Sequence, residues 1–229
     1  MAKHPRRSSG HATDRPKVTT SPREGWGTAL EVGGVVQSVS VPAEGVAGLD
    51  AAPESGEPRP GPGGGYWGLM LPASCPRRAL LLGLGGGTVA ALLARRCPDC
   101  DIVGVERSAE VLVVSRSMLG LDAIPRLTTV QADAFAWVEE HAESEMGSFD
   151  LVCLDLFEAG RLAQGALATP FLRQLATLLA PGGTLSVNLM VTARTRDQLA
   201  RLRHVFTITR ELRLRGNLVA HAIAPADGR

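Results

Sequence analysis

The sequence predicts an α/β protein with a doubly wound, mostly parallel sheet, and three observations support this. Apolar runs of strand length alternate with helical segments, an order that requires right-handed crossovers between parallel strands. A glycine-rich loop directly follows the apolar run at residues 79–82. The last two strand-like runs, residues 205–214 and 217–224, are separated only by Arg215 and Gly216. These two runs should therefore pair antiparallel and close the sheet.

The N-terminal part is expected to be small and irregular. Residues 1–25 are rich in Lys and Arg and poor in large apolar side chains, which predicts a disordered basic tail. Residues 28–32 and 35–41 flank a diglycine turn and predict a β-hairpin. The stretch 42–65 is rich in Pro and Gly and predicts an irregular loop or lid. We therefore expect three regions: the tail over 1–25, the hairpin and its loop over 26–70, and a Rossmann-like catalytic domain over 71–229.

The main domain is expected to alternate strands and helices until its last two strands. Residues 66–70 predict a short helix or turn that leads into it. The expected strands are apolar and bounded by turn residues, at 79–82, 102–106, 126–131, 149–155 and 184–190. The expected helices lie at 89–96, 109–120, 134–141, 169–179 and 194–204. A seven-stranded sheet with one reversed strand is the architecture of class I methyltransferases, whereas a dinucleotide-binding domain would close with another strand and helix.

The glycine loop and the acid that ends the following strand predict a site for an adenosine derivative. The loop residues are Gly83, Gly85, Gly86, Gly87 and Thr88. Backbone N–H groups at the start of the next helix can approach a ligand closely when the loop is glycine-rich. Glu106 lies about 20 residues further on and can hydrogen-bond a ribose diol. The same glycines also satisfy a dinucleotide pattern, so an NAD-binding or non-catalytic Rossmann domain is an alternative.

Two more acids follow strands at the edge of the sheet where ligands bind. Asp133 can accept a hydrogen from the adenine amino group, or it can simply cap the helix that follows. Asp155 faces the reacting end of such a ligand, or it merely ends a strand in solvent. The order of these groups suits an adenosine that carries a sulfonium.

Composition excludes several classes of protein. The formal net charge is +1, and the basic tail accounts for the excess of cations, so a nucleic-acid-binding body is not expected. The sequence shows no secretory segment, and its longest apolar stretch is too short to span a membrane. Four irregularly spaced cysteines predict reduced thiols, and the pair Cys97 and Cys100 lacks the partners of a zinc site. We expect a cytoplasmic protein without a metal.

Taken together, these motifs resemble the spermidine synthase family over nearly everything after the tail. The resemblance rests on residues 33–37, Tyr66 with Met70, residues 85–87, 105–106, 133–134, 149–150 with Asp155, and 180–183. It implies that Gln37 and Tyr66 line the pocket for donor and acceptor. It also implies that Glu106 binds ribose and that Asp133 and Ala134 hold adenine. By the same resemblance, Asp155 handles the attacking amine.

Two departures from that family favour methyl transfer. Thr88 stands where the synthases carry an aspartate that contacts the amine of decarboxylated S-adenosylmethionine. A neutral loop at a helix N-terminus tolerates the carboxylate of ordinary S-adenosylmethionine better than an acid would. The family's acidic segment is also altered, with Asp155 kept and Glu158 a conservative exchange. Similar departures occur in spermidine-synthase-like methyltransferases.

The sequence thus predicts an S-adenosylmethionine-dependent transferase. The first hypothesis is a methyltransferase acting on an unknown small-molecule or protein acceptor, with Asp155 as the catalytic residue and Tyr66 and Glu158 in the acceptor site. The second is a polyamine aminopropyltransferase that uses decarboxylated S-adenosylmethionine and putrescine. We expect no nucleic-acid or membrane partner, and a homodimer is left open.

Overall fold

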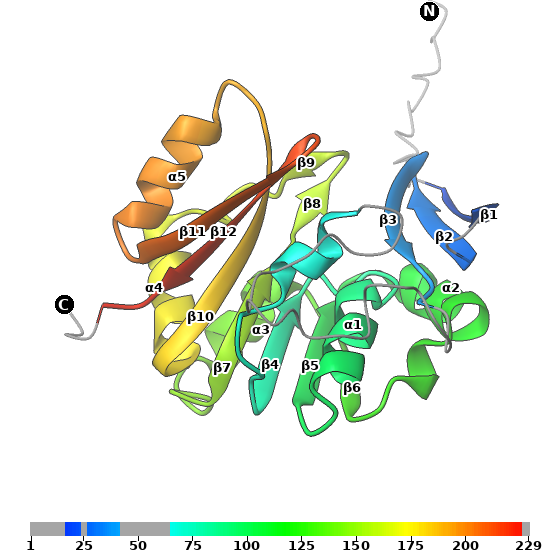
Figure 1. Cartoon of the computed structure of the whole chain (residues 1–229), viewed down its shortest axis with the longest axis horizontal. Helices are drawn as coiled ribbons and strands as arrows, with labels where there is room; N and C mark the ends of the chain where they lie inside the picture. Colours follow the sequence, from blue (N-terminus) through cyan, green and yellow to red (C-terminus); the bar gives the residue numbers. More distant parts are fainter. Residues whose placement is uncertain (1–16, 24–26, 42–64, 226–229) are drawn as a thin grey trace, which may run out of the picture.

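The computed structural model describes residues 17–23, 27–41 and 65–225, which form a seven-stranded central sheet, helices on both of its faces and a small second sheet (Figure 1). The central sheet has the order β11-β12-β10-β7-β4-β5-β6. Its strands are β4 (Arg78–Leu82), β5 (Asp101–Glu106), β6 (Leu127–Gln131), β7 (Phe149–Leu154), β10 (Leu179–Met190), β11 (Thr207–Leu214) and β12 (Asn217–Ile223). Strand β12 runs antiparallel to both of its neighbours, while β4, β5, β6, β7 and β10 are parallel. The predicted mostly parallel sheet with a terminal antiparallel pair is confirmed.

Helices cover the two faces of this sheet in separate groups. They are η2 (Tyr66–Met70), α1 (Thr88–Arg96), α2 (Ala109–Leu119), η3 (Leu121–Ala123), α3 (Ala134–His141), α4 (Thr169–Leu178) and α5 (Thr195–Arg203). Because side chains alternate along a strand, Leu80 and Leu82 pack with α3, α4 and α5, while Ala79 and Leu81 pack with α1, α2 and η2. None of the helices in the described ranges is long and apolar enough to cross a membrane.

Strand β10 begins earlier than the sequence predicts. The prediction ends a helix before Pro181 and starts the strand at Thr184, but the structure continues the strand from Leu179. The pairing of β10 with β7 shifts register between Leu179 and Thr184. Proline and glycine residues are accommodated in a strand at such an irregularity, which is why the turn-like segment still belongs to β10.

The N-terminal sheet contains one strand more than expected. Strands β2 (Gly27–Val32) and β3 (Val35–Val39) form the predicted hairpin, and β1 (Val18–Arg23) pairs antiparallel with β2. The expectation that the tail extends unbroken to residue 25 is therefore wrong for β1. Val18, Thr19 and Thr20 have side chains that favour strands, and Pro22 is tolerated because β1 lies at an edge. The rest of the expected tail and residues 42–64 lie outside the described residues.

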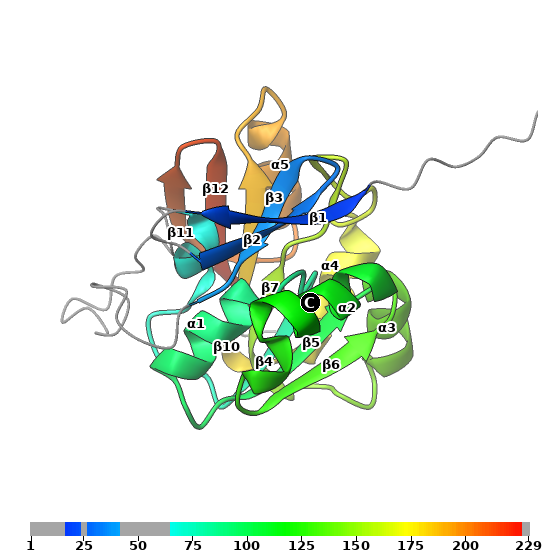
Figure 2. The ribbon, with the colours of Figure 1, turned by 90° about the vertical axis from the view of Figure 1, so that its right-hand side faces the viewer.

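The N-terminal sheet lies next to α1 and α2, on the side of the domain where the glycine loop begins α1 (Figure 2). A further small hairpin, β8 (Phe157–Glu158) with β9 (Arg161–Leu162), follows β7 and was not predicted. Both additions lie near the edge at which β4, β5 and β7 end. Strand β3 contacts the glycine loop that follows β4, and β8 follows β7, so both additions lie beside the expected ligand site.

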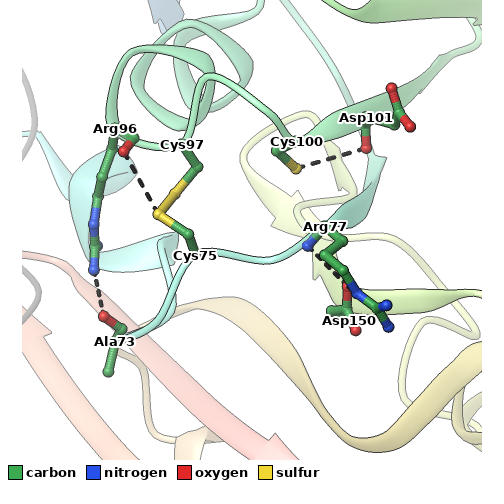
Figure 3. Close-up of a disulfide and its surroundings, with 8 residues drawn as sticks. All are labelled: Ala73, Cys75, Arg77, Arg96, Cys97, Cys100, Asp101 and Asp150. Atoms are coloured by element: carbon green, nitrogen blue, oxygen red, sulfur yellow. Dashed lines mark hydrogen bonds and ion pairs between the residues drawn. A yellow bond between two sulfur atoms is a disulfide. The ribbon is translucent and has the colours of Figure 1, made fainter.

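A disulfide joins Cys75 to Cys97, so the expectation of four reduced thiols is wrong (Figure 3). Cys75 lies in the segment between η2 and β4, and Cys97 is the C-cap residue of α1. Because η2 packs on α1, the two Cα atoms come within 5.4 Å, a distance typical of disulfides. Cys100 keeps a free, buried thiol, and its expected companion Cys97 is bonded elsewhere.

Candidate functional site

The glycine loop turns the chain from β4 into α1 and passes close to two other strands. The N–H groups of Gly83 and Leu84 both donate to the carbonyl of Val105 on β5, at 3.0 Å. A Cβ atom on Gly83 would lie 2.3 Å from the carbonyl oxygen of Asp155, so a side chain there would strike the end of β7. Gly87, with φ of +83°, is the N-cap residue of α1. The loop is therefore held between the ends of β5 and β7.

Strand β3 binds the other side of this loop. The N–H of Gly86 donates to Oγ of Ser38 at 2.7 Å. The hydroxyl of Thr88 accepts a hydrogen bond from the N–H of Val39 and donates one to its carbonyl, both at 2.8 Å. The sequence analysis expects a ligand at Gly86 and Thr88, but the Gly86 N–H and the buried Thr88 hydroxyl have partners within the protein.

Glu106, at the end of β5, lies directly beside the glycine loop. Its Oε2 accepts a hydrogen bond from the N–H of Gly85 at 3.0 Å, and its Oε1 accepts one from the N–H of Ser108 at 2.9 Å. Each carboxylate oxygen has a second lone pair, so the group can still accept hydrogens from a diol. The loop and the ribose-binding candidate are thus brought together as expected from the sequence.

Asp133 performs the capping role and leaves one oxygen available. Its Oδ1 accepts hydrogen bonds from the N–H groups of Phe135 and Ala136, at 2.9 and 3.1 Å. Within the described part of the chain, Oδ2 has no hydrogen-bond partner, and the side chain is exposed. Ala134 follows at the start of α3 and is buried. Capping and contact with an adenine amino group are therefore compatible, since they use different oxygens.

These residues fit an adenosine cofactor. Glu106 presents a carboxylate beside the glycine loop, and Asp133 presents a free carboxylate oxygen at the next strand end. The loop between β4 and α1 carries no side chain at Gly83, where a Cβ would strike the end of β7. All three features lie at the carboxyl edge of parallel strands, where ligands bind in α/β sheets. The glycine loop follows β4, Glu106 ends β5 and Asp133 follows β6, in the order that the sequence predicts.

A second group of polar side chains lies beyond the loop, where β7 and β10 end. The Tyr66 hydroxyl donates to Oδ2 of Asp155 at 2.7 Å. The Asn188 side chain donates through Nδ2 to Oδ1 of the same carboxylate at 2.8 Å. Strand register explains the second contact, because Val187 on β10 pairs with Leu154 on β7 and the next residues are Asn188 and Asp155.

Burial changes the pKa values of Asp155 and Tyr66. Removal from water raises the pKa of Asp155, and the hydrogen bonds from Asn188 and Tyr66 act in the opposite direction. Burial also raises the pKa of Tyr66, and the nearby Asp155 charge raises it further. The hydroxyl of Tyr66 therefore stays protonated and donates to the carboxylate. A carboxyl group with a raised pKa beside a neutral phenol suits proton transfer near neutral pH.

Helix η2 holds Tyr66 in position because it is anchored to strand β12 of the central sheet. The Nε2 atom of His221 on β12 lies 2.7 Å from the carbonyl oxygen of Leu69, and His221 is buried. A carbonyl only accepts, so this nitrogen carries the hydrogen. Burial lowers the pKa of His221, which remains neutral and keeps this single donor in place.

Glu158, predicted to bind the acceptor, and Gln37, predicted to line the pocket for donor and acceptor, have other surroundings. Glu158 on β8 forms an exposed ion pair with Arg107, which directly follows Glu106. Its charge is therefore compensated within the protein. Gln37 on β3 is partly buried and has no partner on β2, because Glu31 pairs with Val36 and Leu30 pairs with Ser38. It is the extra residue of a β-bulge, a feature that redirects a side chain.

The sequence analysis missed three residues that shape this region: Ser38, Asn188 and Asn217. Asn188 and Asn217 lie in strands whose neighbouring residues are mostly apolar, and asparagine is disfavoured in strands. That local conflict is the signal that could have identified them. Ser38 had no such signal, because a serine next to a bulge in a short hairpin is unremarkable in sequence.

Comparison with known proteins agrees with this geometry. Residues 79–183 match a family model described as "Methyltransferase domain". The match covers less than half of the chain, and together with the Rossmann-like sheet it makes this segment similar to methyltransferase domains. The matched segment contains the glycine loop, Glu106, Asp133 and Asp155.

Two curated relatives are named for different reactions, one for methyl transfer and one for aminopropyl transfer. A trans-aconitate 2-methyltransferase of Methylobacterium radiotolerans is 35% identical over 120 residues, which is 52% of this chain and 40% of the relative. A polyamine aminopropyltransferase of Vibrio vulnificus is 26% identical over 132 residues, or 57% of this chain and 44% of the relative. This chain therefore spans less than half the length of these curated relatives.

The fold also resembles that of a solved synthase. The crystal structure of a probable spermidine synthase from Corynebacterium glutamicum has a TM-score of 0.65 and 21% identity, and it covers 90% of this chain and 76% of its own. At that identity the likeness concerns the fold alone. It extends over most of the chain.

Proposed function

We propose that this protein is an S-adenosylmethionine-dependent methyltransferase whose acceptor binds against Tyr66 and Asp155. The observation that carries the proposal is the pair of sites at one edge of the sheet. The loop, Glu106 and Asp133 form the cofactor side, and the Tyr66–Asp155 hydrogen bond of 2.7 Å forms the acceptor side. Gly83 lies between them, against the carbonyl of Asp155.

The residues on the acceptor side have separate roles in this proposal. S-adenosylmethionine supplies a methyl group on a cationic sulfur; transfer forms a bond from the acceptor atom to that carbon, while the carbon–sulfur bond breaks and its electrons go to sulfur. Asp155 accepts the proton that an amine or hydroxyl acceptor loses, and Tyr66 orients the carboxylate. Most of the rate enhancement then comes from positioning two reactants, because the leaving group is already activated.

Aminopropyl transfer, as in the spermidine synthase family, is the second candidate. The sequence similarity to a polyamine aminopropyltransferase and the likeness in fold to a probable spermidine synthase over 90% of this chain favour it. Two features of the chain count against it. The loop carries a buried, neutral Thr88 instead of a carboxylate, and the exposed Glu158 is paired with Arg107. Among the described residues on the acceptor side, this leaves Asp155 as the carboxylate without a cationic partner.

Calorimetric titration with S-adenosylmethionine and with its decarboxylated analogue tests the two candidates side by side. Tighter binding of the intact donor is the expected result. Tighter binding of the decarboxylated donor, with turnover of putrescine, would replace the methyltransferase with an aminopropyltransferase. Binding of neither would overturn both, and protection by NAD alone would favour the dinucleotide alternative.

Glu158→Gln sharpens this comparison. If the protein is a methyltransferase, the variant binds S-adenosylmethionine as tightly as the natural chain, because the exposed Glu158 is paired with Arg107 and not with the glycine loop or Glu106. If it is an aminopropyltransferase, the variant raises KM for putrescine. A variant at Asp155 would not separate the candidates, since both need that carboxylate.

A further inference from the structure

A chain of hydrogen bonds continues from Asp155 into the sheet, beyond any residue that the proposed reaction requires. Asn217 on β12 donates through Nδ2 to Oδ1 of Asn188 at 3.0 Å. Asn188 on β10 in turn donates to Asp155 at 2.8 Å. With the Tyr66 bond, the chain links η2, β7, β10 and β12. Asn188 is 1% exposed, so water does not supply its partners.

The chemistry of these groups determines how the Asn188 amide is oriented. An ionised carboxylate only accepts hydrogen bonds, so the amide atom facing Asp155 must be nitrogen. The oxygen of Asn188 then faces Asn217, which must present its own nitrogen. Asn217 pairs with Met190 on β10, which places its side chain beside that of Asn188. Reversing the Asn188 amide would set acceptor against acceptor at Asp155 and donor against donor at Asn217.

We propose that Asn188 is a positioning residue which, held in one orientation by Asn217, donates to Oδ1 of Asp155 and keeps that carboxylate ionised and aligned with Tyr66. This inference rests on the proposed function, since it assigns Asp155 the acceptor proton. Hydrogen bonds to a charged group are stronger than those between neutral groups, so the Asn188 contact offsets part of the penalty of burying Asp155. Without it, the carboxylate would be protonated at higher pH.

The surroundings of Asp155 hold few other groups that titrate. Tyr66 faces it from η2, and Cys153 lies two residues earlier on β7. Burial raises the pKa of the Cys153 thiol far above neutrality, so it stays uncharged. From β4, the backbone carbonyl of Leu82 accepts the N–H of Asp155, and no charge is added. His221 on β12 contacts the Leu69 carbonyl of η2, and burial lowers its pKa, so in the folded protein it takes up a proton only at a pH below its ordinary value. A step in the Tyr66 signal that disappears in Asp155→Asn therefore reports on Asp155.

Tyr66 provides the reporter, because it is the only tyrosine in the chain. Tyrosine labelled with carbon-13 at Cζ gives one NMR resonance, and its shift follows the hydrogen bond to Asp155 as pH changes. This measurement needs neither the cofactor nor a known acceptor. In the natural protein we expect one step in the shift, at a pH above the usual range of an aspartate. Asp155→Asn should abolish the step.

In Asn188→Ala, the midpoint of this step should move upward by about one to two pH units, which corresponds to the loss of one hydrogen bond to a charged group. Asn217→Ala, at a half-buried position, should move the midpoint in the same direction by a smaller amount. This variant tests the proposal if Asn188→Ala does not fold. Ser186→Ala is the matched control. It changes a buried polar residue on the same strand and face, two residues from Asn188, and should leave the midpoint in place.

An unchanged midpoint in both asparagine variants would overturn the proposal. So would a step that persists in Asp155→Asn, or an equal shift in Ser186→Ala, which would mean that any change in β10 has the same effect. Failure of the natural protein to bind S-adenosylmethionine would refute the proposed function while leaving this titration intact. Once an acceptor is known, Asn188→Ala should lower kcat and leave KM for S-adenosylmethionine unchanged.

Discussion

Thr88 and Val39 are joined by a reciprocal pair of hydrogen bonds, each 2.8 Å long, between a side-chain hydroxyl and both backbone groups of one residue. The pair connects the first turn of α1 to the last residue of β3, 49 positions earlier. The adjacent bond from Gly86 to Ser38 reinforces it. The position that distinguishes this chain from the synthases therefore joins the N-terminal sheet to the cofactor loop.

Thr88→Val should destabilise the protein, because it leaves the buried N–H and carbonyl of Val39 without partners. The expected loss is about 1–3 kcal/mol in the free energy of unfolding, measured by urea denaturation. Thr88→Ser keeps the hydroxyl and should lose less. Equal losses in the two variants would mean that packing of the methyl group matters and the hydrogen bonds do not.

Glu106→Gln should weaken binding of S-adenosylmethionine by about 10- to 100-fold, because a charged acceptor for the ribose and for the Gly85 N–H is lost. Calorimetry of the variant against the natural chain measures this directly. Glu110→Gln changes an exposed acid in the first turn of α2 and should bind the cofactor normally. If both variants bind alike, Glu106 is not a ribose ligand.

His221 should make stability fall as pH is lowered from 7 to 5, against the opposite effect of the raised pKa of Asp155. Burial lowers the pKa of His221 in the folded state below the ordinary value near 6.5, so the unfolded chain binds more protons at this residue in this range. Stability then rises with pH, with a slope of at most about 1.4 kcal/mol per pH unit for one group. Arg210, its neighbour in register on β11, acts in the same direction.

His221→Gln retains a donor for the Leu69 carbonyl but cannot take up a proton. Urea denaturation at several pH values should therefore give a flatter profile than in the natural protein. His204→Gln, at an exposed position after α5, is the control and should keep the natural slope. An unchanged slope in His221→Gln would show that another group governs stability in this range.

Loss of the Cys75–Cys97 disulfide should also reduce stability. The bond closes a segment of 22 residues, for which restriction of the unfolded chain predicts about 3 kcal/mol. Replacing both cysteines with serine should have the same effect on urea unfolding as adding a reductant to the natural protein. A reductant that further destabilises the double variant would point to some other thiol chemistry.

Local sequence patterns were sufficient to predict the order of strands and helices in the main domain. Apolar runs, the glycine loop and capping residues such as Ser108 and Asp133 act within a few residues, so they are visible without a structure. The same holds for Glu106, because a strand, loop and helix of normal length bring it back to the loop. These predictions succeed because they rest only on the spacing of residues along the chain.

The remaining features depend on contacts between distant segments. Asn188 meets Asp155 only through the register of two strands, and Cys75 meets Cys97 only because η2 packs on α1. Gln37 was predicted as a pocket residue, but its bulge follows from pairing with β2. The ion pair that neutralises Glu158 likewise joins two separate strand ends. No short window of sequence contains both partners.

The acceptor-side groups come mostly from outside the segment that matches the methyltransferase family. Tyr66, Asn188 and Asn217 lie before residue 79 or after residue 183, whereas Glu106 and Asp133 lie within it. Under the proposed function, the side chains that orient Asp155 are thus encoded outside the stretch that would bind the donor, while Asp155 itself lies within it. Substitutions in the flanking stretches would then alter how this carboxylate is held during divergence and leave the donor-binding residues unaltered.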